Sequence, residues 1–475
     1  MTGMELEGRR AGVMGLGISG EAAARFLAQA GATVIAADAR QEAAAGPVAD
    51  ELREAGISIA AGEDEQLFEG CDLVIISPGV PPDSAPVRAA RARGTRVLSE
   101  IELAGRVLQG RIAGITGSNG KSTVTAMTSA ILTESGLKAR PCGNIGLPLI
   151  SMADRTPRTV HVKDLDRDET TGGDAPGVIY VTEISSFQLE ATESFRPEVA
   201  ALLNLSPDHQ DRYESDDAYY AAKARIFLNQ GPSDTAVINA DDPRTWALAA
   251  TLRARLVSFS LGAGGGEGVR LRDGAFVHVR GASETWLMSA ADAPLPGRHN
   301  LENVAASAAI AIALGAQPAA VARAVTSFTA LPHRLRPVGR AHGVRFFDDS
   351  KATNVGAAMR AVESFEAPVI LLLGGRDKGG DFRGLARQAA SRVKRIVTFG
   401  EAGPAIAAAV GDEIPVLLCG SMEDATRGAL DGAAPGDVIL LAPACASFDA
   451  YAGYAARGRA FEATVRQIER AEGSD

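Results

Sequence analysis

The segment Thr116–Thr123, with the sequence TGSNGKST, carries residue types that bind phosphate groups. An apolar stretch, RIAGI, precedes it and a helix-forming stretch, VTAMTSAIL, follows it, so a strand is predicted to turn into a helix here. Small residues let backbone N–H groups surround phosphate oxygens, the helix N-terminus adds a favourable dipole, and Lys121 adds a positive charge. Ser122 or Thr123 can offer a hydroxyl to Mg²⁺. The predicted nucleotide-binding loop consists of Gly117, Ser118, Asn119, Gly120, Lys121, Ser122 and Thr123.

The spacing of this loop differs from that of the common nucleotide hydrolases. Their loop has a glycine at the position that is Ile115 in this chain. The loop is therefore a shorter form, GxxGKS, which begins at Gly117. Because strand, glycine turn, G-K-S-T and helix follow in order, phosphate binding is favoured over an ordinary turn with a solvated lysine.

Polar side chains also follow two other apolar stretches. GVIYVT ends in Glu183, where a carboxylate can reach a metal ion held by neighbouring phosphates. EVAALLN leads to Asp208, His209 and Asp211 in a loop, where a histidine by itself is more often structural. Lys223 lies in a helical stretch and by itself is an ordinary solvated lysine. The residues alone predict a metal and phosphate site and leave the histidine and the lysine open.

The motifs resemble those of the Mur ligases and of the related folylpolyglutamate synthases, whose phosphate loop has the form TGxxGK[ST]. The other matching motifs follow in the order of the family: GNIGLPL at Gly143–Leu149, TEISSFQLE at Thr182–Glu190, NLSPDHQDRY at Asn204–Tyr213, LPHR at Leu331–Arg334, DDSKATN at Asp348–Asn354 and PACASFD at Pro443–Asp449. The resemblance implies an ATP-dependent ligase that forms an amide bond through an acyl phosphate, with two Mg²⁺ ions.

The resemblance also assigns roles to single residues. It implies that the catalytic residues are Lys121, Glu183, His209 and Lys223. The metal ligands would be Ser122, Glu183, His209 and Lys223, with the lysine carbamylated by CO₂. Beyond the phosphate loop, the residues expected to contact ATP are Asn300, Asn303, His333, Arg334, Asp349 and Lys351. Taken alone, the two asparagines open a helix, where their ordinary role is capping.

The N-terminal part contains GLGISG at Gly15–Gly20, and Asp38 closes the next apolar stretch. This dinucleotide-binding fingerprint makes an NAD-dependent oxidoreductase the alternative. A single match is weak, and such an enzyme would leave Lys121, Glu183 and Lys223 without a role. In the Mur ligases this domain binds a UDP-sugar instead. The UDP-substrate would contact Ile18, Ser19, Asp38, Arg40, Gly79, Asn144, Ser185 and Gln188.

The order of GLGISG, GNIG and SSFQLE, and above all PACASFD, favours the member of the family that adds D-glutamate to UDP-N-acetylmuramoyl-L-alanine. The alternative is another Mur ligase, which adds L-alanine, a diamino acid or a dipeptide. A diamino-acid enzyme is expected to carry D-N-P-R, where this chain has GGRDKGGDF. D-Glutamate would contact His209, Thr353, Lys378, Ser447 and Tyr454. Phenylalanine is more usual at the position of Tyr454.

Apolar strands that alternate with helix-like stretches predict an α/β fold with three domains. We expect a Rossmann-like UDP-sugar-binding domain over residues 1–100, a central P-loop ATP-binding domain over 101–330, and a Rossmann-like amino-acid-binding domain over 331–475. The polar stretch 154–177 is predicted to be a surface insertion, and alternating residues over 256–288 predict antiparallel hairpins at the edge of the central domain.

Composition excludes several classes of protein. The 475 residues exceed one domain of ~150 residues. A net charge of -10 opposes nucleic-acid binding, and no apolar stretch approaches the ~20 residues that span a membrane. The start of the chain lacks a signal-like pattern, so we expect a cytoplasmic protein. The four cysteines show no C-x-x-C spacing and predict neither disulfides nor zinc. We expect a monomer that uses ATP and two substrates.

Overall fold

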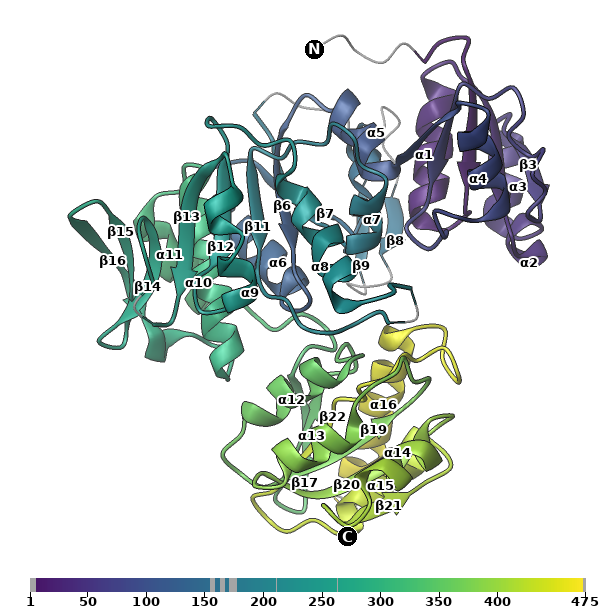
Figure 1. Ribbon diagram of the computed structural model, residues 1–475. Helices are drawn as coiled ribbons and strands as arrows, with labels where there is room; N and C mark the ends of the chain where they lie inside the picture. Colours follow the sequence, from purple (N-terminus) through teal and green to yellow (C-terminus); the bar gives the residue numbers. More distant parts are fainter. Residues whose placement is uncertain are drawn as a thin grey trace. The chain divides into compact units, whose positions relative to one another are not determined.

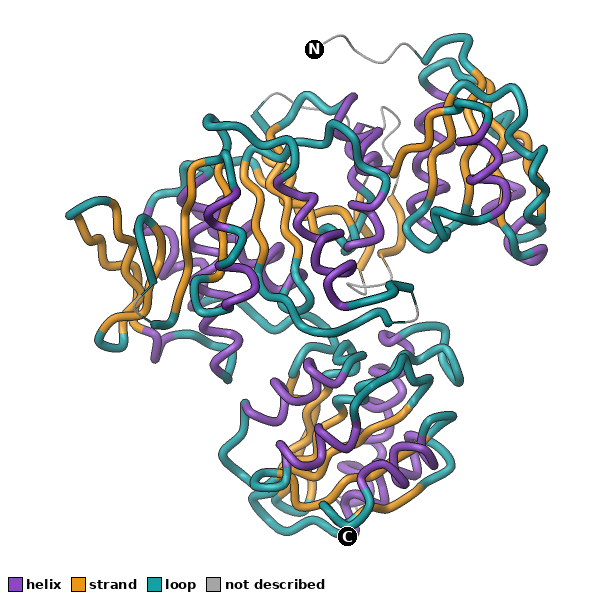
Figure 2. Tube along the Cα trace, viewed as in Figure 1, coloured by secondary structure: helices purple, strands orange, loops and turns teal. Residues whose placement is uncertain are grey.

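The computed structural model describes residues 6–153, 159–162, 167–170, 177–210, 212–262 and 264–472. The chain forms two compact units. The first contains the chain up to Leu205 with Tyr219–Ala291 and Val304–Val325, and the second contains Ser206–Ala218, Asp292–Asn303 and the chain from Thr326 onward. Three large sheets with helices on their faces confirm the predicted α/β fold class (Figures 1 and 2). The first unit holds two of these sheets, and the second unit holds the third.

The first sheet has five parallel strands in the order β3-β2-β1-β4-β5. Its central strands are apolar and buried, as expected for a parallel sheet that helices cover. The bounds of the strands are Arg10–Met14 for β1, Thr33–Asp38 for β2, Ser58–Ala61 for β3, Leu73–Ile76 for β4 and Arg96–Ser99 for β5. The helices are α1 (Ile18–Gln29), α2 (Gln41–Ala44), α3 (Pro47–Glu54), α4 (Ala85–Ala92) and α5 (Glu100–Val107).

The second sheet has nine strands in the order β16-β15-β14-β13-β12-β11-β6-β10-β7. Its parallel strands include β6 (Arg111–Thr116), β7 (Ala139–Gly143), β10 (Ile179–Glu183), β11 (Val199–Leu202), β12 (Thr235–Asn239) and β13 (Arg255–Ser260). The strands β14 (Gly268–Arg272), β15 (Ala275–Arg280) and β16 (Ser283–Ser289) form the predicted antiparallel edge. The expectation was wrong for β13, which pairs in parallel with β12 and β14 because its apolar residues are buried in the sheet.

Helices and short segments complete the region around the second sheet. They are α6 (Lys121–Glu134), η1 (Leu149–Ala153), α7 (Ser186–Glu190), α8 (Asp216–Ala224), η2 (Arg225–Phe227), α9 (Pro243–Trp246), η3 (Ala249–Thr251), η4 (Ala290–Asp292), α10 (Arg298–Ala313) and α11 (Pro318–Thr326). Within the predicted insertion 154–177, β8 (Thr159–Val162) pairs antiparallel with β9 (Arg167–Thr170). Most of the remaining insertion lies outside the described residues.

The third sheet has six strands in the order β17-β18-β22-β19-β20-β21. The bounds are Arg336–Ala341 for β17, Val344–Asp348 for β18, Val369–Gly374 for β19, Val393–Phe399 for β20, Val416–Leu418 for β21 and Val438–Leu441 for β22. All pairs are parallel except β17 with β18. The helices are α12 (Val355–Glu363), α13 (Phe382–Ala389), α14 (Gly403–Val410), α15 (Met422–Asp431) and α16 (Tyr454–Glu472).

The sheet order explains where functional loops gather. In the second sheet, β6 lies between β11 and β10, so the loops after these three strands share one edge. In the third sheet, β22 lies between β18 and β19, which brings their following loops together in the same way. The carboxyl ends of parallel strands are the usual place for ligands in such folds. Among the described residues, no helix has the length and apolarity required to cross a membrane.

Candidate active site

The phosphate loop connects β6 to α6, as the sequence predicts. Gly120 is the N-cap residue of α6 and has a φ of 84°, a left-handed conformation that favours glycine. Gly117 has a φ of 154°, and a Cβ at this position would lie 3.0 Å from the Cβ of Leu203. The two glycines therefore allow the chain to turn tightly from the strand into a helix whose N-terminus can face an anion.

Asn204 supports the phosphate loop from the end of β11. Its backbone carbonyl accepts from the Ser118 N–H at 2.9 Å, and its side-chain oxygen accepts from the Asn119 N–H at 2.9 Å. Its side-chain amide also donates to the Asn119 carbonyl at 3.1 Å. Asn204 begins the motif NLSPDHQDRY, and these contacts assign it the role of holding the loop.

Lys121 is the first residue of α6, and its side chain folds back over the loop. The ammonium group donates to the carbonyl oxygens of Gly117 at 2.8 Å and Ser118 at 3.0 Å. The side chain is partly buried, and the bonded carbonyls fix its charge at the loop. In this position the ammonium group can give up its hydrogen bonds to the two carbonyl oxygens and donate to phosphate oxygens instead.

Ser122, Glu183 and Asn144 meet at the ends of α6, β10 and β7. The Ser122 hydroxyl donates to one oxygen of the Glu183 carboxylate, and the Asn144 amide donates to the other at 2.8 Å. Ser122 and Glu183 are almost fully buried. Hydroxyl and carboxylate oxygens are the ligand atoms that Mg²⁺ prefers, so this pair fits the predicted metal site. Asn144 was predicted to contact the UDP-substrate, and in the structure its side-chain amide donates to the Glu183 carboxylate.

Lys223 lies in α8 and is 1% exposed. Its ammonium group donates to the Gly117 carbonyl at 2.9 Å and lies 4.5 Å from the centre of the Tyr219 ring. Lys121 and Lys223 therefore share one acceptor on the phosphate loop. A lysine is rarely buried so completely without a partner, so its location at the loop excludes the simple interpretation of a solvated side chain.

His209 belongs to the second unit and stands in the left-handed region, with a φ of 57°. Its backbone N–H donates to the Asp208 carboxylate at 2.9 Å, and its Nε2 lies 3.7 Å from the other oxygen of that carboxylate. The Asn354 amide donates to the same group at 2.7 Å. Asp208 thus joins the histidine loop to the start of α12. Asp211 lies outside the described residues.

Asn300 and Asn303 lie in the first turns of α10 and are buried. The Asn300 amide donates to the Pro296 carbonyl at 2.7 Å, and the Asn303 amide donates to the Asn300 side-chain oxygen at 3.1 Å. The two side chains form a connected pair at the helix start. Their predicted contact with ATP stays a prediction.

Asp38, at the end of β2, holds the glycine-rich turn of the first sheet. Its carboxylate accepts from the Leu16 N–H at 2.9 Å and from the Arg40 N–H and guanidinium, both at 3.0 Å. Burial raises the pKa of Asp38, but the hydrogen bonds from Arg40 and Leu16 outweigh it and lower the pKa overall. Ile18 and Gly79 are exposed and Ser19 is partly buried beside this turn.

Ser185 and Gln188 form a capping box at the start of α7. The Ser185 N–H donates to the Gln188 side chain at 2.9 Å, and the Gln188 N–H donates to the Ser185 hydroxyl at 3.2 Å. Gln188 is 1% exposed. These two predicted substrate contacts therefore have a structural role as well.

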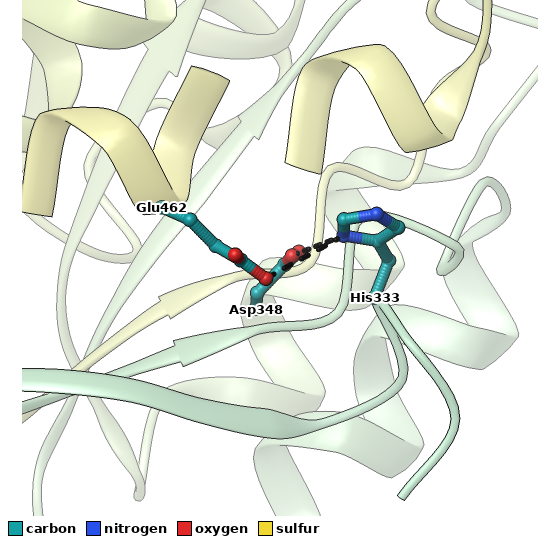
Figure 3. A group of neighbouring side chains, drawn as sticks. All are labelled: His333, Asp348 and Glu462. Carbon is teal, nitrogen blue, oxygen red and sulfur yellow. Dashed lines mark hydrogen bonds and ion pairs between the residues drawn. The ribbon is translucent and has the colours of Figure 1, made fainter. Parts of the chain in front are cut away.

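His333, Asp348 and Glu462 form a cluster in the second unit (Figure 3). The Nδ1 atom of His333 lies 2.6 Å from Asp348 Oδ2 and 4.0 Å from Glu462 Oε1. Arg336 lies 3.5 Å from the same glutamate oxygen. His333 is hydrogen-bonded directly to Asp348, and Glu462 is close to Arg336. These contacts indicate that the cluster stabilises the LPHR turn, a role that they fit better than the binding of a metal ion. A Cβ at Gly458 would lie 2.1 Å from Nδ1, so α16 leaves room for the ring.

The segment after β18 carries Asp349, Lys351 and Thr353. Burial raises the pKa of Asp349 to about 7, Arg334 opposes the rise, and Asp348 adds to it. The Lys351 ammonium lies 3.7 Å from the centre of the Tyr454 ring. This cation–π contact joins a residue predicted for ATP to one predicted for the amino acid.

The other predicted amino-acid contacts follow β19 and β22. Lys378 is partly buried and Ser447 is 2% exposed. Their two loops are joined by a pair of backbone hydrogen bonds between Arg376 and Ala446, at 2.8 and 2.9 Å. Thr353, Lys378 and Ser447, three of the five predicted glutamate contacts, therefore lie on neighbouring loops of the third sheet.

The phosphate loop with its neighbouring carboxylate and buried lysine defines a nucleotide-using enzyme. Family models match most of the chain: the Mur ligase MurD-like N-terminal domain at residues 9–99, the Mur ligase middle domain at 115–311, and the Mur ligase glutamate ligase domain at 333–445. The chain belongs to the Mur ligase family.

Two relatives are named UDP-N-acetylmuramoylalanine--D-glutamate ligase. The protein from Acidobacterium capsulatum is 41% identical over 471 residues, which cover 97% of each chain. The protein from Desulfatibacillum aliphaticivorans is 39% identical over 466 residues, which cover 98% of this chain and 100% of the relative. A solved pseudomurein peptide ligase type C from Methanothermus fervidus shares the fold, with a TM-score of 0.59, 16% identity, and coverage of 97% and 100%.

Proposed function

We propose that this chain is an ATP-dependent ligase that joins D-glutamate to UDP-N-acetylmuramoyl-L-alanine in peptidoglycan precursor synthesis. The observation that carries the proposal is identity of 39–41% over nearly the full length of relatives that bear this name. The arrangement of the phosphate loop, Glu183 and Lys223 supports it, because these residues would have no role in the alternative oxidoreductase.

The proposed reaction has two steps. A carboxylate oxygen of the UDP-substrate attacks the γ-phosphorus of ATP, which forms an acyl phosphate and releases ADP. The amine of D-glutamate then attacks the carbonyl carbon, so that an amide forms, inorganic phosphate leaves and the nitrogen loses a proton. Lys121 and the N-terminus of α6 stabilise the negative charge on the transferring phosphoryl group, and no covalent nucleophile of the protein is required.

Magnesium fits the oxygen ligands of this site. Ser122 and Glu183 would hold one Mg²⁺, and Lys223, once carbamylated, would hold a second. His209 stays a predicted ligand. When bound, these ions neutralise charge on the phosphate oxygens. Carbamylation would convert the Lys223 ammonium, now bonded to the Gly117 carbonyl, into an anion beside the phosphate loop.

The amino-acid site is proposed for the loops after β18, β19 and β22. D-Glutamate carries two carboxylates, which suits one cation and two hydroxyl groups: Lys378, Thr353 and Ser447. The remaining predicted contacts with ATP and the UDP-substrate belong to the same proposal, as do the boundaries 1–100, 101–330 and 331–475, a monomeric state and a cytoplasmic location.

Phosphate release with omission of single substrates tests the proposal. Release should require ATP, the UDP-substrate and D-glutamate together. With ¹⁸O in the substrate carboxylate, one ¹⁸O atom should appear in the inorganic phosphate, because the acyl phosphate transfers that oxygen. Absence of ATP consumption with all substrates present would contradict the ligase function, and unlabelled phosphate would contradict the acyl phosphate.

A further inference from the structure

Arg457 lies in the first turn of α16 and is completely buried. All five of its N–H groups have acceptors. Nε donates to the Ser350 hydroxyl at 3.0 Å, and Nη2 donates to the carbonyls of Ser350 at 2.9 Å and Cys445 at 3.1 Å. Nη1 donates to the carbonyls of Gly374 at 3.2 Å and Ala446 at 3.3 Å. All five acceptors are neutral oxygens. The guanidinium group is therefore held by directed hydrogen bonds and not by an ion pair.

The five acceptors come from three separate segments of the third sheet. Ser350 lies directly after β18, Gly374 ends β19, and Cys445 and Ala446 follow β22. These are the loops that carry the proposed amino-acid contacts, namely Thr353 after β18, Lys378 after β19 and Ser447 after β22. The Ser350 hydroxyl also donates to the carbonyl of Tyr454 at 2.9 Å, which ties the start of α16 to the same group.

We propose that Arg457 is a positioning residue, which fixes the three loops of the amino-acid site relative to one another and thereby determines the affinity for the amino acid. This inference rests on the proposed function for the class of substrate. The guanidinium acts through Thr353, Lys378 and Ser447, and it has no contact of its own with the substrate.

The chemistry of the position requires arginine. A lysine has three donors and no planar fork, so it cannot satisfy five acceptors in three segments. Burial lowers the pKa of Arg457 to about 10, which leaves the group charged at neutral pH. Gly375 makes room for it, since a Cβ there would lie 2.9 Å from Nη1. The surrounding chain is thus shaped around a guanidinium.

The test compares Arg457→Lys with the matched variant Arg392→Lys. Arg392 also donates to a backbone carbonyl, that of Phe365 at 2.8 Å, but it precedes β20 at the opposite edge of the sheet. Arg457→Lys should raise the KM for D-glutamate between about tenfold and a hundredfold and leave the KM for the UDP-substrate within about twofold. Arg392→Lys should change neither KM, and thermal unfolding of both variants measures any general loss of stability.

An unchanged KM for D-glutamate in Arg457→Lys would overturn the proposal. An equal rise in every KM, or a loss of kcat that only follows the loss of folded protein, would overturn it as well. If Arg457→Lys does not fold, Ser350→Ala decides, because it removes the Nε acceptor and the bond to the Tyr454 carbonyl but leaves the four carbonyl acceptors of Arg457 in place. It should raise the KM for D-glutamate by a few-fold, and no change would contradict the role.

The wild-type enzyme is assayed first with D-glutamate. Failure to use it would contradict the proposed function and not the positioning role. In that case, the same comparison of variants is made with the amino acid that the wild-type enzyme accepts.

Discussion

The ammonium group of Lys351 lies 3.7 Å from the centre of the Tyr454 ring. The two residues are far apart in sequence, and Tyr454 begins α16 while Lys351 follows β18. His333 contacts the same ring edge-on, with 6.4 Å between ring centres. Tyr454 therefore holds the lysine by the face of its ring, a function that phenylalanine can also perform.

Tyr454→Phe should keep the KM for ATP within about twofold, because the ring face remains. Tyr454→Leu should raise it by about twofold to thirtyfold, which corresponds to the ~0.5–2 kcal/mol of a cation–π contact. Steady-state kinetics at saturating UDP-substrate and D-glutamate provide the measurement. Equal KM values for the two variants would show that the ring does not hold Lys351.

Lys223→Ala should lower the rate of phosphate release by about 10²–10³-fold, because it removes a buried group from the phosphate loop. Short carboxylic acids should restore part of the activity if the lysine functions as a carbamate. Lys138→Ala, at an exposed lysine before β7, is the control and should be fully active. A fully active Lys223→Ala variant would refute the predicted role.

Glu183→Gln should lower kcat by about 10²-fold and raise the Mg²⁺ concentration required for half-maximal rate, because a carboxylate ligand is lost. The control is Glu198→Gln, since Glu198 pairs with Arg111 at the opposite end of the same sheet. That variant should retain the Mg²⁺ dependence of the wild type. The same Mg²⁺ dependence in both variants would remove Glu183 from the metal site.

The raised pKa of the buried Glu100 carboxyl predicts that the stability of the protein depends on pH. Burial raises its pKa from 4.5 to about 7, although the Ile150 N–H and Gln188 oppose the rise. The protonated Glu100 carboxyl therefore contributes fully to the free energy of unfolding below pH 4.5, and this contribution is lost as the pH rises through 7. Glu100→Gln removes the ionisation, so its advantage over the wild type in free energy of unfolding should grow to about 3 kcal/mol at pH 8. Urea unfolding at pH 5 and pH 8 measures it.

Glu102 is the control for this effect, because its shift has the opposite sign. Burial raises its pKa, but hydrogen bonds from Ser194, Glu193 and Arg106 outweigh burial and lower the pKa overall. Its contribution is present above pH 4.5 and is lost as the pH falls through the lowered pKa. Glu102→Gln should therefore destabilise the protein at pH 8. Stabilisation by both variants would contradict the assigned shifts.

Local patterns predicted most of the fold. The apolar run, the glycines and the helix-forming stretch around Lys121 are adjacent in sequence, so they predicted strand, loop and helix correctly. In the third sheet region, strands alternate with helices from β18 to α16, as the alternation of apolar and helix-like stretches predicted. The short strands β3 (SIAA) and β17 (RPVGRA) are harder to predict from the residues alone, because each contains a single β-branched residue.

Long-range contacts could not be predicted from the residues themselves. Lys223 looks like an exposed helical lysine, and its burial depends on Gly117, 106 residues away. Arg457 lies in an ordinary charged helix pattern, yet Ser350, 107 residues away, accepts two of its hydrogen bonds. The resemblance to a family identified the first of these residues, and only the structure identified the second.

The central claim is tested most directly by phosphate release from ATP with UDP-N-acetylmuramoyl-L-alanine and one amino acid at a time. The amino acids are D-glutamate, L-glutamate, L-lysine and diaminopimelate, and the product is identified by its mass. We predict turnover with D-glutamate and the mass of its amide product. Turnover with a diamino acid and none with D-glutamate would contradict the account.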